Sequence, residues 1–167
     1  MTAPLPLTLS LPDEEATARL ARALAPELGA GDTLALAGPI GAGKSFFART
    51  LIRHRLNAVG KDEDIPSPTF TLVQTYQAGE LEIWHSDLYR LSMPDEVFEL
   101  GLEEAFGSAL CLIEWPDRMG DDLPSHALLL TFAPLEDDRR AVTLSSRDPG
   151  WSARLAPVLN TSGCSDD

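Results

Sequence analysis

The chain has 167 residues, 44% of them hydrophobic and 23% charged, which fits one globular domain and excludes a disordered chain. Its 13 basic and 26 acidic residues give a net charge of −13, which argues against a large nucleic-acid interface but not against one phosphate ligand in a dedicated pocket. The two cysteines make neither a disulfide framework nor a metal cluster. We expect no signal peptide and find no apolar run near the ~20 residues of a membrane span, so we predict a cytoplasmic protein without a membrane segment.

The first part of the chain alternates strand and helix patterns. Residues 5–9 predict a short edge strand, and a helix is expected from about Asp13, where acidic residues suit a helix N-terminus. The apolar run 33–37 predicts a buried strand. Residues 44–56 predict an amphipathic helix, because they carry one apolar stripe and place basic residues late. The polar stretch 57–68, broken by prolines, indicates a loop.

The rest of the chain predicts two hairpins around a further buried strand. Strand-like runs at 69–77 and 81–87 form the first hairpin, and runs at 127–133 and 141–145 form the second. The uninterrupted apolar run 109–113 is typical of a strand covered on both faces.

Two more helices are predicted, at residues 93–106 and 151–159. Residues 161–167 are expected to be a disordered tail that follows a single domain, residues 1–160. Strands that alternate with helices, together with two hairpins, predict an α/β fold of three layers, in which helices flank a mixed parallel and antiparallel sheet.

Residues 38–45, Gly-Pro-Ile-Gly-Ala-Gly-Lys-Ser, match the phosphate-loop motif G-x-x-x-x-G-K-[ST] and lie between a predicted strand and a predicted helix. Gly41 and Gly43 permit backbone conformations that let N–H groups surround phosphate oxygens at a helix N-terminus. Lys44 is expected to point into an open pocket and reach the β- and γ-phosphates, while the Ser45 hydroxyl binds Mg²⁺. A turn that uses glycine only for its geometry is the weaker interpretation, so we predict a P-loop NTPase-like fold. The residues predicted to contact the nucleotide are Gly38, Gly41, Ala42, Gly43, Lys44, Ser45 and Phe46.

A phosphate loop needs a carboxylate at the end of a neighbouring strand to position Mg²⁺ and water. Glu114 ends the core strand and Asp87 ends the second strand of the first hairpin, so both are candidates. Taken alone, each acid is as readily a cap or a salt-bridge partner. His85 with Asp87 suggests a transition-metal pair, but two residues make that site weak, and a structural role for His85 is the stronger interpretation.

Two further residues, Thr69 and Trp115, have two interpretations each. Thr69, in the Ser-Pro-Thr-Phe stretch 67–70, either contacts Mg²⁺ or the γ-phosphate or stands at the proline-stiffened start of a strand. Trp115 directly follows Glu114 and either flanks the nucleotide or packs against the core.

Four motifs occur together: the phosphate loop, residues 67–70, His-Ser-Asp-Leu-Tyr-Arg-Leu at 85–91, and Glu-Trp-Pro at 114–116. In this order and spacing they resemble the TsaE family, also called YjeE, the small bacterial P-loop ATPases of tRNA threonylcarbamoyladenosine synthesis. The phosphate loop alone is generic, whereas the other three motifs in combination are specific. The resemblance runs over residues 9–144.

The resemblance implies a mixed seven-stranded sheet with ATP and Mg²⁺ at its edge. It implies that Ser45 and Glu114 serve the metal, that Asp87 and Thr69 lie close to the phosphates, and that these two act with Lys44 in catalysis. It also implies an ATPase that works with TsaD and TsaB, of which TsaD transfers the threonylcarbamoyl group to a tRNA adenosine. The acidic charge agrees with the tRNA being held by those partners.

The chain departs from the family pattern in the phosphate loop. Pro39 stands where the family usually has an acid, and Phe46 stands where it commonly has a second hydroxyl residue. The hydroxyl contact to the α-phosphate is therefore lost, although the backbone N–H of Phe46 remains. Arg139 and Arg140, on the second hairpin, are candidates to cover the adenine or the ribose, as similar arginines do in the family.

Two other functions stay open from the sequence. One is a small P-loop kinase of a nucleoside or metabolite, although such kinases usually carry an arginine-bearing lid and the arginines here are scattered. The other is a nucleotide-binding adaptor without useful turnover.

Overall fold

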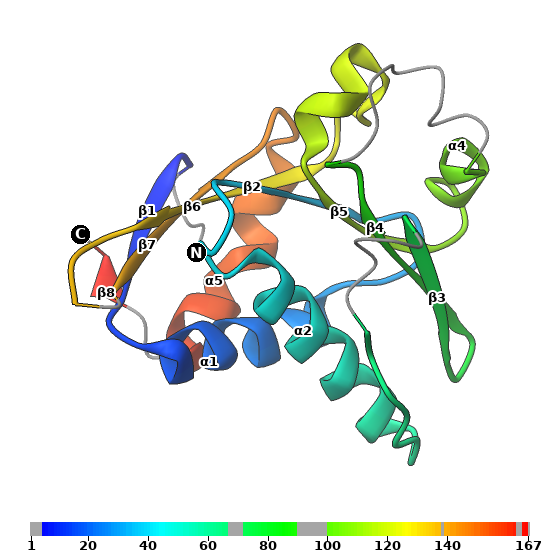
Figure 1. The fold of residues 1–167 in the computed structure, drawn as a ribbon, viewed down its shortest axis with the longest axis horizontal. Helices are drawn as coiled ribbons and strands as arrows, with labels where there is room; N and C mark the ends of the chain where they lie inside the picture. Colours follow the sequence, from blue (N-terminus) through cyan, green and yellow to red (C-terminus); the bar gives the residue numbers. More distant parts are fainter. Residues whose placement is uncertain (1–4, 67–71, 90–99, 138, 163–164, 167) are drawn as a thin grey trace.

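The strands of the protein form one sheet with helices on its faces (Figure 1), and the computed structural model describes residues 5–66, 72–89, 100–137, 139–162 and 165–166. The strands are β1 (Leu7–Leu11), β2 (Thr33–Ala37), β3 (Val73–Ala78), β4 (Leu81–Asp87), β5 (Leu110–Glu114), β6 (Leu128–Pro134), β7 (Arg140–Ser145) and β8 (Ser165–Asp166). The helical segments are α1 (Glu14–Leu24), η1 (Ala25–Glu27), α2 (Lys44–Ala58), α4 (Leu102–Ala105), η2 (Pro116–Asp122) and α5 (Gly150–Ser162). None of the helices in these ranges has the length and apolar character that crossing a bilayer requires.

The sheet has eight strands in the order β3-β4-β5-β2-β6-β7-β1-β8. The four neighbouring strands β4, β5, β2 and β6 run parallel, and the other strands pair antiparallel. The predicted mixed α/β sheet is thus confirmed, but the implied count of seven strands is wrong, because the two-residue β8 adds to β1 at Leu9 and Ser10. The carboxyl ends of the parallel strands meet at one edge, which is where ligands bind in open α/β sheets.

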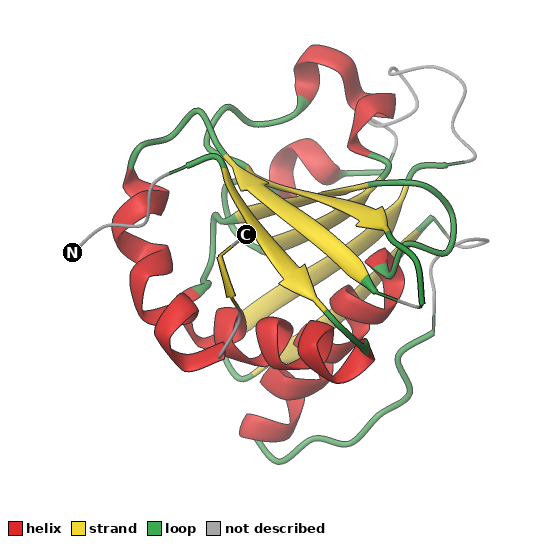
Figure 2. Ribbon diagram, turned by 90° about the vertical axis from the view of Figure 1, so that its left-hand side faces the viewer, coloured by secondary structure: helices red, strands yellow, loops and turns green. Residues whose placement is uncertain are grey.

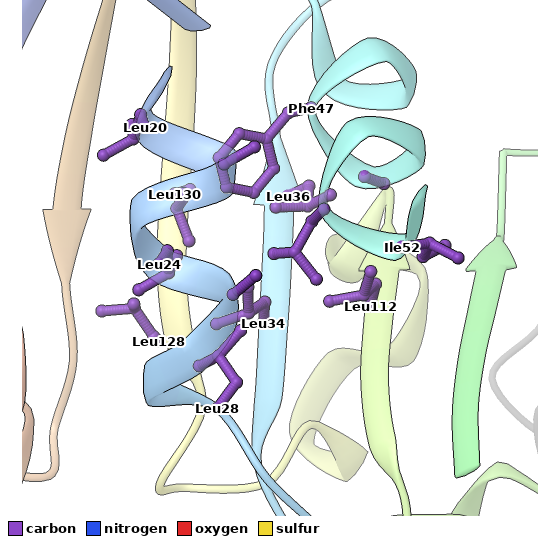
Figure 3. Packing of buried hydrophobic residues seen from close by; sticks show 14 of the residues in the cluster. Leu20, Leu24, Leu28, Leu34, Leu36, Phe47, Ile52, Leu112, Leu128 and Leu130 are labelled. Atoms are coloured by element: carbon purple, nitrogen blue, oxygen red, sulfur yellow. The ribbon is translucent and has the colours of Figure 1, made fainter. Parts of the chain in front are cut away.

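Helices α1, α2 and α5 cover one face of the sheet, as Figures 1 and 2 show. Leu24 of α1 and Phe47 of α2 belong to one buried cluster with Leu34 and Leu36 of β2 and Leu112 of β5, which Figure 3 shows from close by. All five side chains are at most 1% exposed. Burying each of them contributes about 1.5–3 kcal/mol, so this layer holds the strand edge and the start of α2 in fixed relation.

A smaller apolar cluster covers the other face of β5. It joins Cys111 and Ile113 of β5 to Leu102 of α4 and Met119 of η2, all of them fully buried. Strand β5 is therefore covered on both faces, as its apolar run predicts. Burial raises the pKa of the Cys111 thiol to about 12, so this cysteine stays protonated and is no nucleophile.

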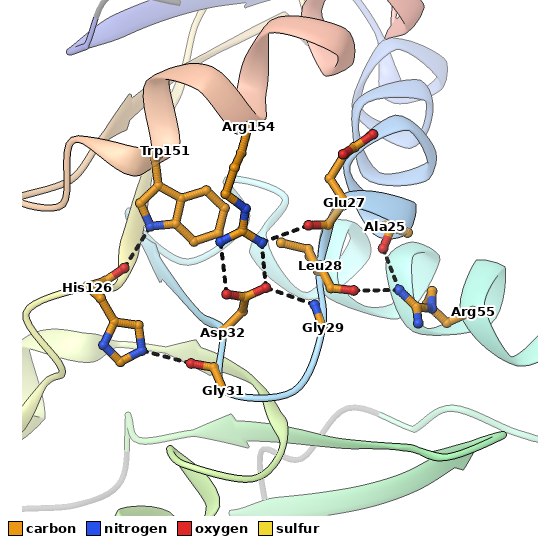
Figure 4. Close-up of polar contacts among 10 residues, drawn as sticks. All are labelled: Ala25, Glu27, Leu28, Gly29, Gly31, Asp32, Arg55, His126, Trp151 and Arg154. Atoms are coloured by element: carbon orange, nitrogen blue, oxygen red, sulfur yellow. Dashed lines mark hydrogen bonds and ion pairs between the residues drawn. The ribbon is translucent and has the colours of Figure 1, made fainter. Parts of the chain in front are cut away.

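Helix α5 is attached to the turn that precedes β2 by polar contacts (Figure 4). The Arg154 guanidinium donates to both oxygens of Asp32, at 3.0 and 2.6 Å, and lies 4.0 Å from the centroid of the Trp151 ring. Trp151 Nε1 donates to the carbonyl oxygen of His126 at 2.7 Å, and the His126 ring contacts the Gly31 carbonyl at 2.8 Å. These contacts fix the beginning of β2, the strand that leads into the phosphate loop.

The observed elements differ from the predicted ones mainly near the ends of the chain. The strand expected at 5–9 runs over Leu7–Leu11 and lies inside the sheet, because β8 pairs with its free edge. The helix expected at 151–159 extends over Gly150–Ser162, and Ser165 and Asp166 form β8 where composition predicts a disordered tail. Pairing with β1 satisfies backbone groups that an exposed edge would leave free.

Two predicted segments fall partly outside the described residues. The helix expected at 93–106 has only its last part described, where α4 covers Leu102–Ala105, and residues 90–99 lie outside. The strand expected at 69–77 is described from β3 (Val73–Ala78) onward, and residues 67–71 lie outside. The other predicted strands and helices lie within a few residues of their expected positions, whereas η1 and η2 were not predicted.

Candidate nucleotide-binding site

The phosphate loop connects β2 to α2 at the carboxyl edge of the parallel strands. Gly38, Gly41 and Gly43 all have positive φ, at 135°, 82° and 104°. Gly43 is the N-cap of α2, whose first turn has no acidic residue and no side-chain cap, so no side chain of that turn neutralises the positive end of the helix dipole at the loop. A Cβ at Gly38 would overlap the carbonyl oxygen of Phe132 in β6, so this turn requires glycine.

Lys44, the first residue of α2, folds back over the loop. Its ammonium donates to the Gly38 carbonyl oxygen and lies 3.5 Å from the centroid of the Trp115 ring. Lys44 is only 5% exposed, and burial lowers the pKa of its amine, although Glu114 and Asp87 raise it. Lys44 thus lies at the pocket, as expected, but its side chain is buried rather than open to solvent. The side chain lines the pocket, but its ammonium already has partners, because a buried cation needs acceptors.

Two carboxylates lie side by side at the ends of β4 and β5. Asp87 and Glu114 are partners in the parallel ladder and are 5% and 2% exposed. Glu114 Oε1 accepts a hydrogen bond of 2.8 Å from Ser45 Oγ on α2. Asp87 Oδ1 accepts a bond of 3.0 Å from the backbone N–H of Tyr89. The structure therefore brings both candidate acids to the start of α2.

The oxygens of Ser45 and Glu114 fit a Mg²⁺ site. Ligands at adjacent corners of an octahedron with metal–oxygen distances of ~2.1 Å lie about 3 Å apart. Ser45 Oγ and Glu114 Oε1 are 2.8 Å apart, and hydroxyl and carboxylate oxygens are donors that suit this ion. Within the part of the chain that the structure describes, no group of three or more His, Cys, Asp and Glu side chains could hold a metal.

His85 lies on the other side of Glu114. Its Nε2 is 2.7 Å from Glu114 Oε2, and the imidazole is completely buried. The two carboxylate oxygens of Glu114 thus have separate partners: the His85 ring on β4 and the Ser45 hydroxyl on α2. In the structure, His85 is therefore hydrogen-bonded to Glu114. It does not form the pair with Asp87 that a transition-metal site would need.

A pocket of about 410 Å³ opens beside these groups. Its lining consists of Ile40, Gly41, Gly43, Lys44, Ser45, Phe46, Asp87, Tyr89, Glu114, Trp115 and Arg140. Ile40, Phe46 and Tyr89 form an exposed apolar rim, with exposed fractions of 74%, 37% and 43%. Arg140 Nη2 donates to the Gly41 carbonyl at 3.4 Å, so the second hairpin contacts the phosphate loop. The loop, both carboxylates and Arg140 share this one pocket.

Most of the predicted site residues line the pocket, with four exceptions. Arg139 is exposed and donates to the Glu136 carbonyl of its own hairpin, outside the pocket lining. Gly38 contributes its carbonyl oxygen to Lys44, and Ala42 is buried behind the loop. Thr69 lies outside the described residues. Ile40 and Tyr89 also line the pocket, although the sequence did not predict them as site residues. The Tyr89 ring lies 4.8 Å from that of Trp115 between centroids. The sequence did hold a signal for Tyr89, because an aromatic residue closely follows each strand-end acid: Tyr89 after Asp87 and Trp115 after Glu114.

A larger hollow of about 620 Å³ lies between η2 and the ends of β6 and β7. Its lining residues are Gly120, Leu123, Pro124, Ser125, Ala127, Leu129, Ser145, Ser146 and Arg147. Those residues include no carboxylate and no part of the phosphate loop. The smaller pocket is therefore the candidate site, since it gathers the groups that can do chemistry.

Comparison with known proteins agrees with this geometry. A family model described as "Threonylcarbamoyl adenosine biosynthesis protein TsaE" matches residues 11–142. The chain belongs to the TsaE family. The site described above contains residues from three of the four motifs on which the resemblance to TsaE rests, and the fourth, residues 67–70, lies outside the described residues.

Three relatives illustrate the similarity to TsaE. The Rickettsia felis protein named tRNA threonylcarbamoyladenosine biosynthesis protein TsaE is 40% identical over 136 residues, which are 81% of this chain and 78% of the relative. The Bacillus subtilis protein of the same name is 35% identical over 140 residues, or 83% of each chain. The crystal structure of Bacillus subtilis YdiB superposes with a TM-score of 0.72 at 26% identity. The superposition covers 96% of this chain and 97% of the YdiB chain.

Proposed function

We propose that this TsaE-family protein binds ATP with Mg²⁺ and hydrolyses it in the cytoplasm, and that the activity serves threonylcarbamoyladenosine formation in tRNA together with TsaB and TsaD. The observation that carries the proposal is the Ser45 and Glu114 oxygen pair, 2.8 Å apart, beside the N-terminus of α2. A phosphate loop with such a pair is the arrangement by which P-loop enzymes hold a metal–triphosphate complex. The names of the TsaE relatives support the pathway.

Each phosphate-binding group of the chain has one role in this proposal. The N–H groups of the loop and the first turn of α2 bind phosphate oxygens, aided by the helix dipole. Lys44 exchanges the Gly38 carbonyl for the β- and γ-phosphate oxygens. Ser45 and Glu114 hold Mg²⁺, which neutralises charge on the phosphates when it is bound.

Asp87 is the group that we assign to the attacking water. It lies beside Glu114 in the ladder and lines the pocket, and its Oδ1 is oriented by the Tyr89 N–H. A carboxylate held in this way can orient a water molecule and accept its proton as a general base. Thr69 remains a proposed contact to the metal or the γ-phosphate, which rests on the family resemblance.

The nucleoside end of the ligand is assigned to Phe46 and Arg140. Both residues line the pocket, and Arg140 already contacts the loop through the Gly41 carbonyl. Because Phe46 replaces the usual second hydroxyl, only its backbone N–H is left to bond the α-phosphate. Its half-exposed ring adds an apolar surface at that position.

An assay of phosphate release tests the proposal. The purified protein is incubated with ATP, with and without Mg²⁺, and with and without candidate nucleoside acceptors. We expect slow, Mg²⁺-dependent release that needs no acceptor. Release only with an acceptor would identify a kinase, and tight binding without release would identify an adaptor. Threonylcarbamoyladenosine formation with TsaB and TsaD, with this protein present or omitted, tests the pathway.

A further inference from the structure

We propose that His85 is a positioning residue that fixes the direction in which Glu114 presents its other oxygen to Ser45 and to the metal. The inference rests on the proposed function, because it concerns the same site. It starts from the two hydrogen bonds of Glu114, one from each side of the carboxylate: Oε2 to His85 Nε2 at 2.7 Å and Oε1 to Ser45 Oγ at 2.8 Å.

The sheet register puts the imidazole behind the carboxylate. His85 and Asp87 are two residues apart on β4, so they point to the same face of the sheet. Their partners on β5 are Leu112 and Glu114, which also share a face. Glu114 lies beside Asp87 and diagonally from His85, so the ring reaches the carboxylate from the core side. Asp87 and Ser45 then flank its exposed side.

The hydrogen bonding of His85 favours a positioning role over packing alone. Its Nε2 bonds to Glu114, whereas its buried Nδ1 has no hydrogen-bond partner in the described structure. Buried polar atoms are normally paired, and leaving one unpaired is unfavourable. A leucine could fill this completely buried position without that penalty. The single bond to Glu114 is thus the feature that imidazole adds.

The mechanism is restriction of a flexible side chain. Glu114 is 2% exposed, so bulk water cannot hold its carboxylate, and among the described residues the Ser45 hydroxyl is the one hydrogen-bond partner that would remain without His85. That hydroxyl must itself turn to the metal when the site is loaded. Partners that orient metal ligands in this way typically change metal affinity or activity by about 10- to 100-fold when they are lost.

The experiment compares His85→Gln with His85→Leu. Glutamine can place an amide N–H near the position of Nε2, whereas leucine fills the space without a donor. The readout is Mn²⁺ affinity, measured by electron paramagnetic resonance in the presence of a non-hydrolysable ATP analogue. Affinity for the analogue in EDTA and thermal melts are measured alongside. His54→Leu is the matched control, because His54 is half-buried on α2 and does not line the pocket.

We expect His85→Leu to weaken Mn²⁺ binding by about 10- to 100-fold, as for loss of a partner that orients a metal ligand. Its analogue affinity in EDTA should stay near wild type, and His85→Gln should recover most of the metal affinity. Wild-type metal affinity in His85→Leu, or an equal loss in both variants, would overturn the positioning role.

If His85→Leu does not fold, His85→Asn replaces it, because the asparagine amide is too short to reach Glu114. Equal affinities of the Asn and Gln variants would then overturn the role. Absence of Mn²⁺ binding in the wild type would instead overturn the proposed function itself.

Discussion

Lys44 and Trp115 show how single residues at this site depend on one another. Trp115 has a positive φ of 61°, which is rare for a non-glycine residue, and this conformation accompanies the placement of its ring beside the Lys44 ammonium at 3.5 Å. Strained conformations of this kind concentrate at functional sites. The ring and the Gly38 carbonyl hold the cation near the loop, so the lysine of the motif is a structural element as well as a ligand-binding one.

Replacing Lys44 by alanine should therefore affect both ATP binding and stability. We expect ATP affinity to fall by roughly 10- to 150-fold, because a hydrogen bond to a charged group contributes about 1.5–3 kcal/mol. Stability should fall by about 1–2 kcal/mol, because the half-buried Gly38 carbonyl loses its donor. Calorimetry with ATP and a thermal melt check the two effects. Lys61→Ala is the control, since this exposed lysine does not line the pocket and donates to the Gln77 carbonyl, at 2.6 Å. Wild-type ATP affinity in Lys44→Ala would exclude the phosphate-binding role.

The two acids should separate into a binding role and a turnover role. Glu114→Gln should weaken Mg²⁺-dependent ATP binding, by about 10-fold or more, because Ser45 and Glu114 form the proposed metal pair. Asp87→Asn should leave ATP affinity near wild type and lower turnover by about 10²- to 10⁴-fold, the contribution typical of a general base. Both substitutions keep the side-chain volume, so packing is preserved. An Asp87→Asn protein that hydrolyses ATP at the normal rate would contradict the assignment of Asp87.

At the scale of elements, the contact between the phosphate loop and β6 determines whether β2 can turn into α2. Gly38 has a φ of 135°, and a Cβ there would overlap the backbone carbonyl oxygen of Phe132, which a neighbouring side-chain movement cannot relieve. We expect Gly38→Ala to lower stability by at least about 1–3 kcal/mol, the cost of backbone strain alone, and to abolish nucleotide binding. Denaturant unfolding measures this, with Gly29→Ala as the control, because nothing lies within 4 Å of a Cβ at Gly29. Equal stabilities of the two variants would mean that the loop adapts.

The sequence predicts those elements whose signal is local. The apolar runs give β2 and β5, and the glycine-rich turn with its lysine gives the phosphate loop, because each depends on neighbouring residues. Strand β8 could not be predicted, since two polar residues become a strand only by pairing with Leu9 and Ser10. The contact of His85 with Glu114 depends on the register of β4 against β5, which pattern alone does not reveal. The contact of the Lys44 ammonium with the Trp115 ring likewise could not be predicted, because it accompanies a positive φ at Trp115.

At the scale of the whole molecule, the charge of −13 and the position of the pocket set what the protein can contact. With so few cations, it can neutralise few phosphates, so direct tRNA affinity should be weak at physiological salt. We expect filter binding at ~0.15 M salt, where screening extends over about 8 Å, to give no saturable tRNA binding below micromolar protein. Adding TsaB and TsaD should bring this protein and tRNA into one complex. Tight tRNA binding by the protein alone would contradict this view of the charge.

Association with TsaB and TsaD should depend on the bound nucleotide. The exposed apolar side chains Ile40, Phe46 and Tyr89 line the same pocket as the phosphate loop, so a nucleotide alters the surface that a partner meets. A ligand can shift such an association only by its different affinity for the free and bound forms. A pull-down of TsaB and TsaD with a non-hydrolysable ATP analogue, with ADP, or without nucleotide measures this coupling, and recovery should be highest in one nucleotide state. Lys44→Ala is the matched control, because a variant with weakened ATP affinity should give close to the nucleotide-free recovery in all three conditions, at nucleotide concentrations that only just saturate the wild type. Equal recovery by the wild-type protein in the three conditions would mean that its contact with the partners is constitutive and that ATP acts at a later step.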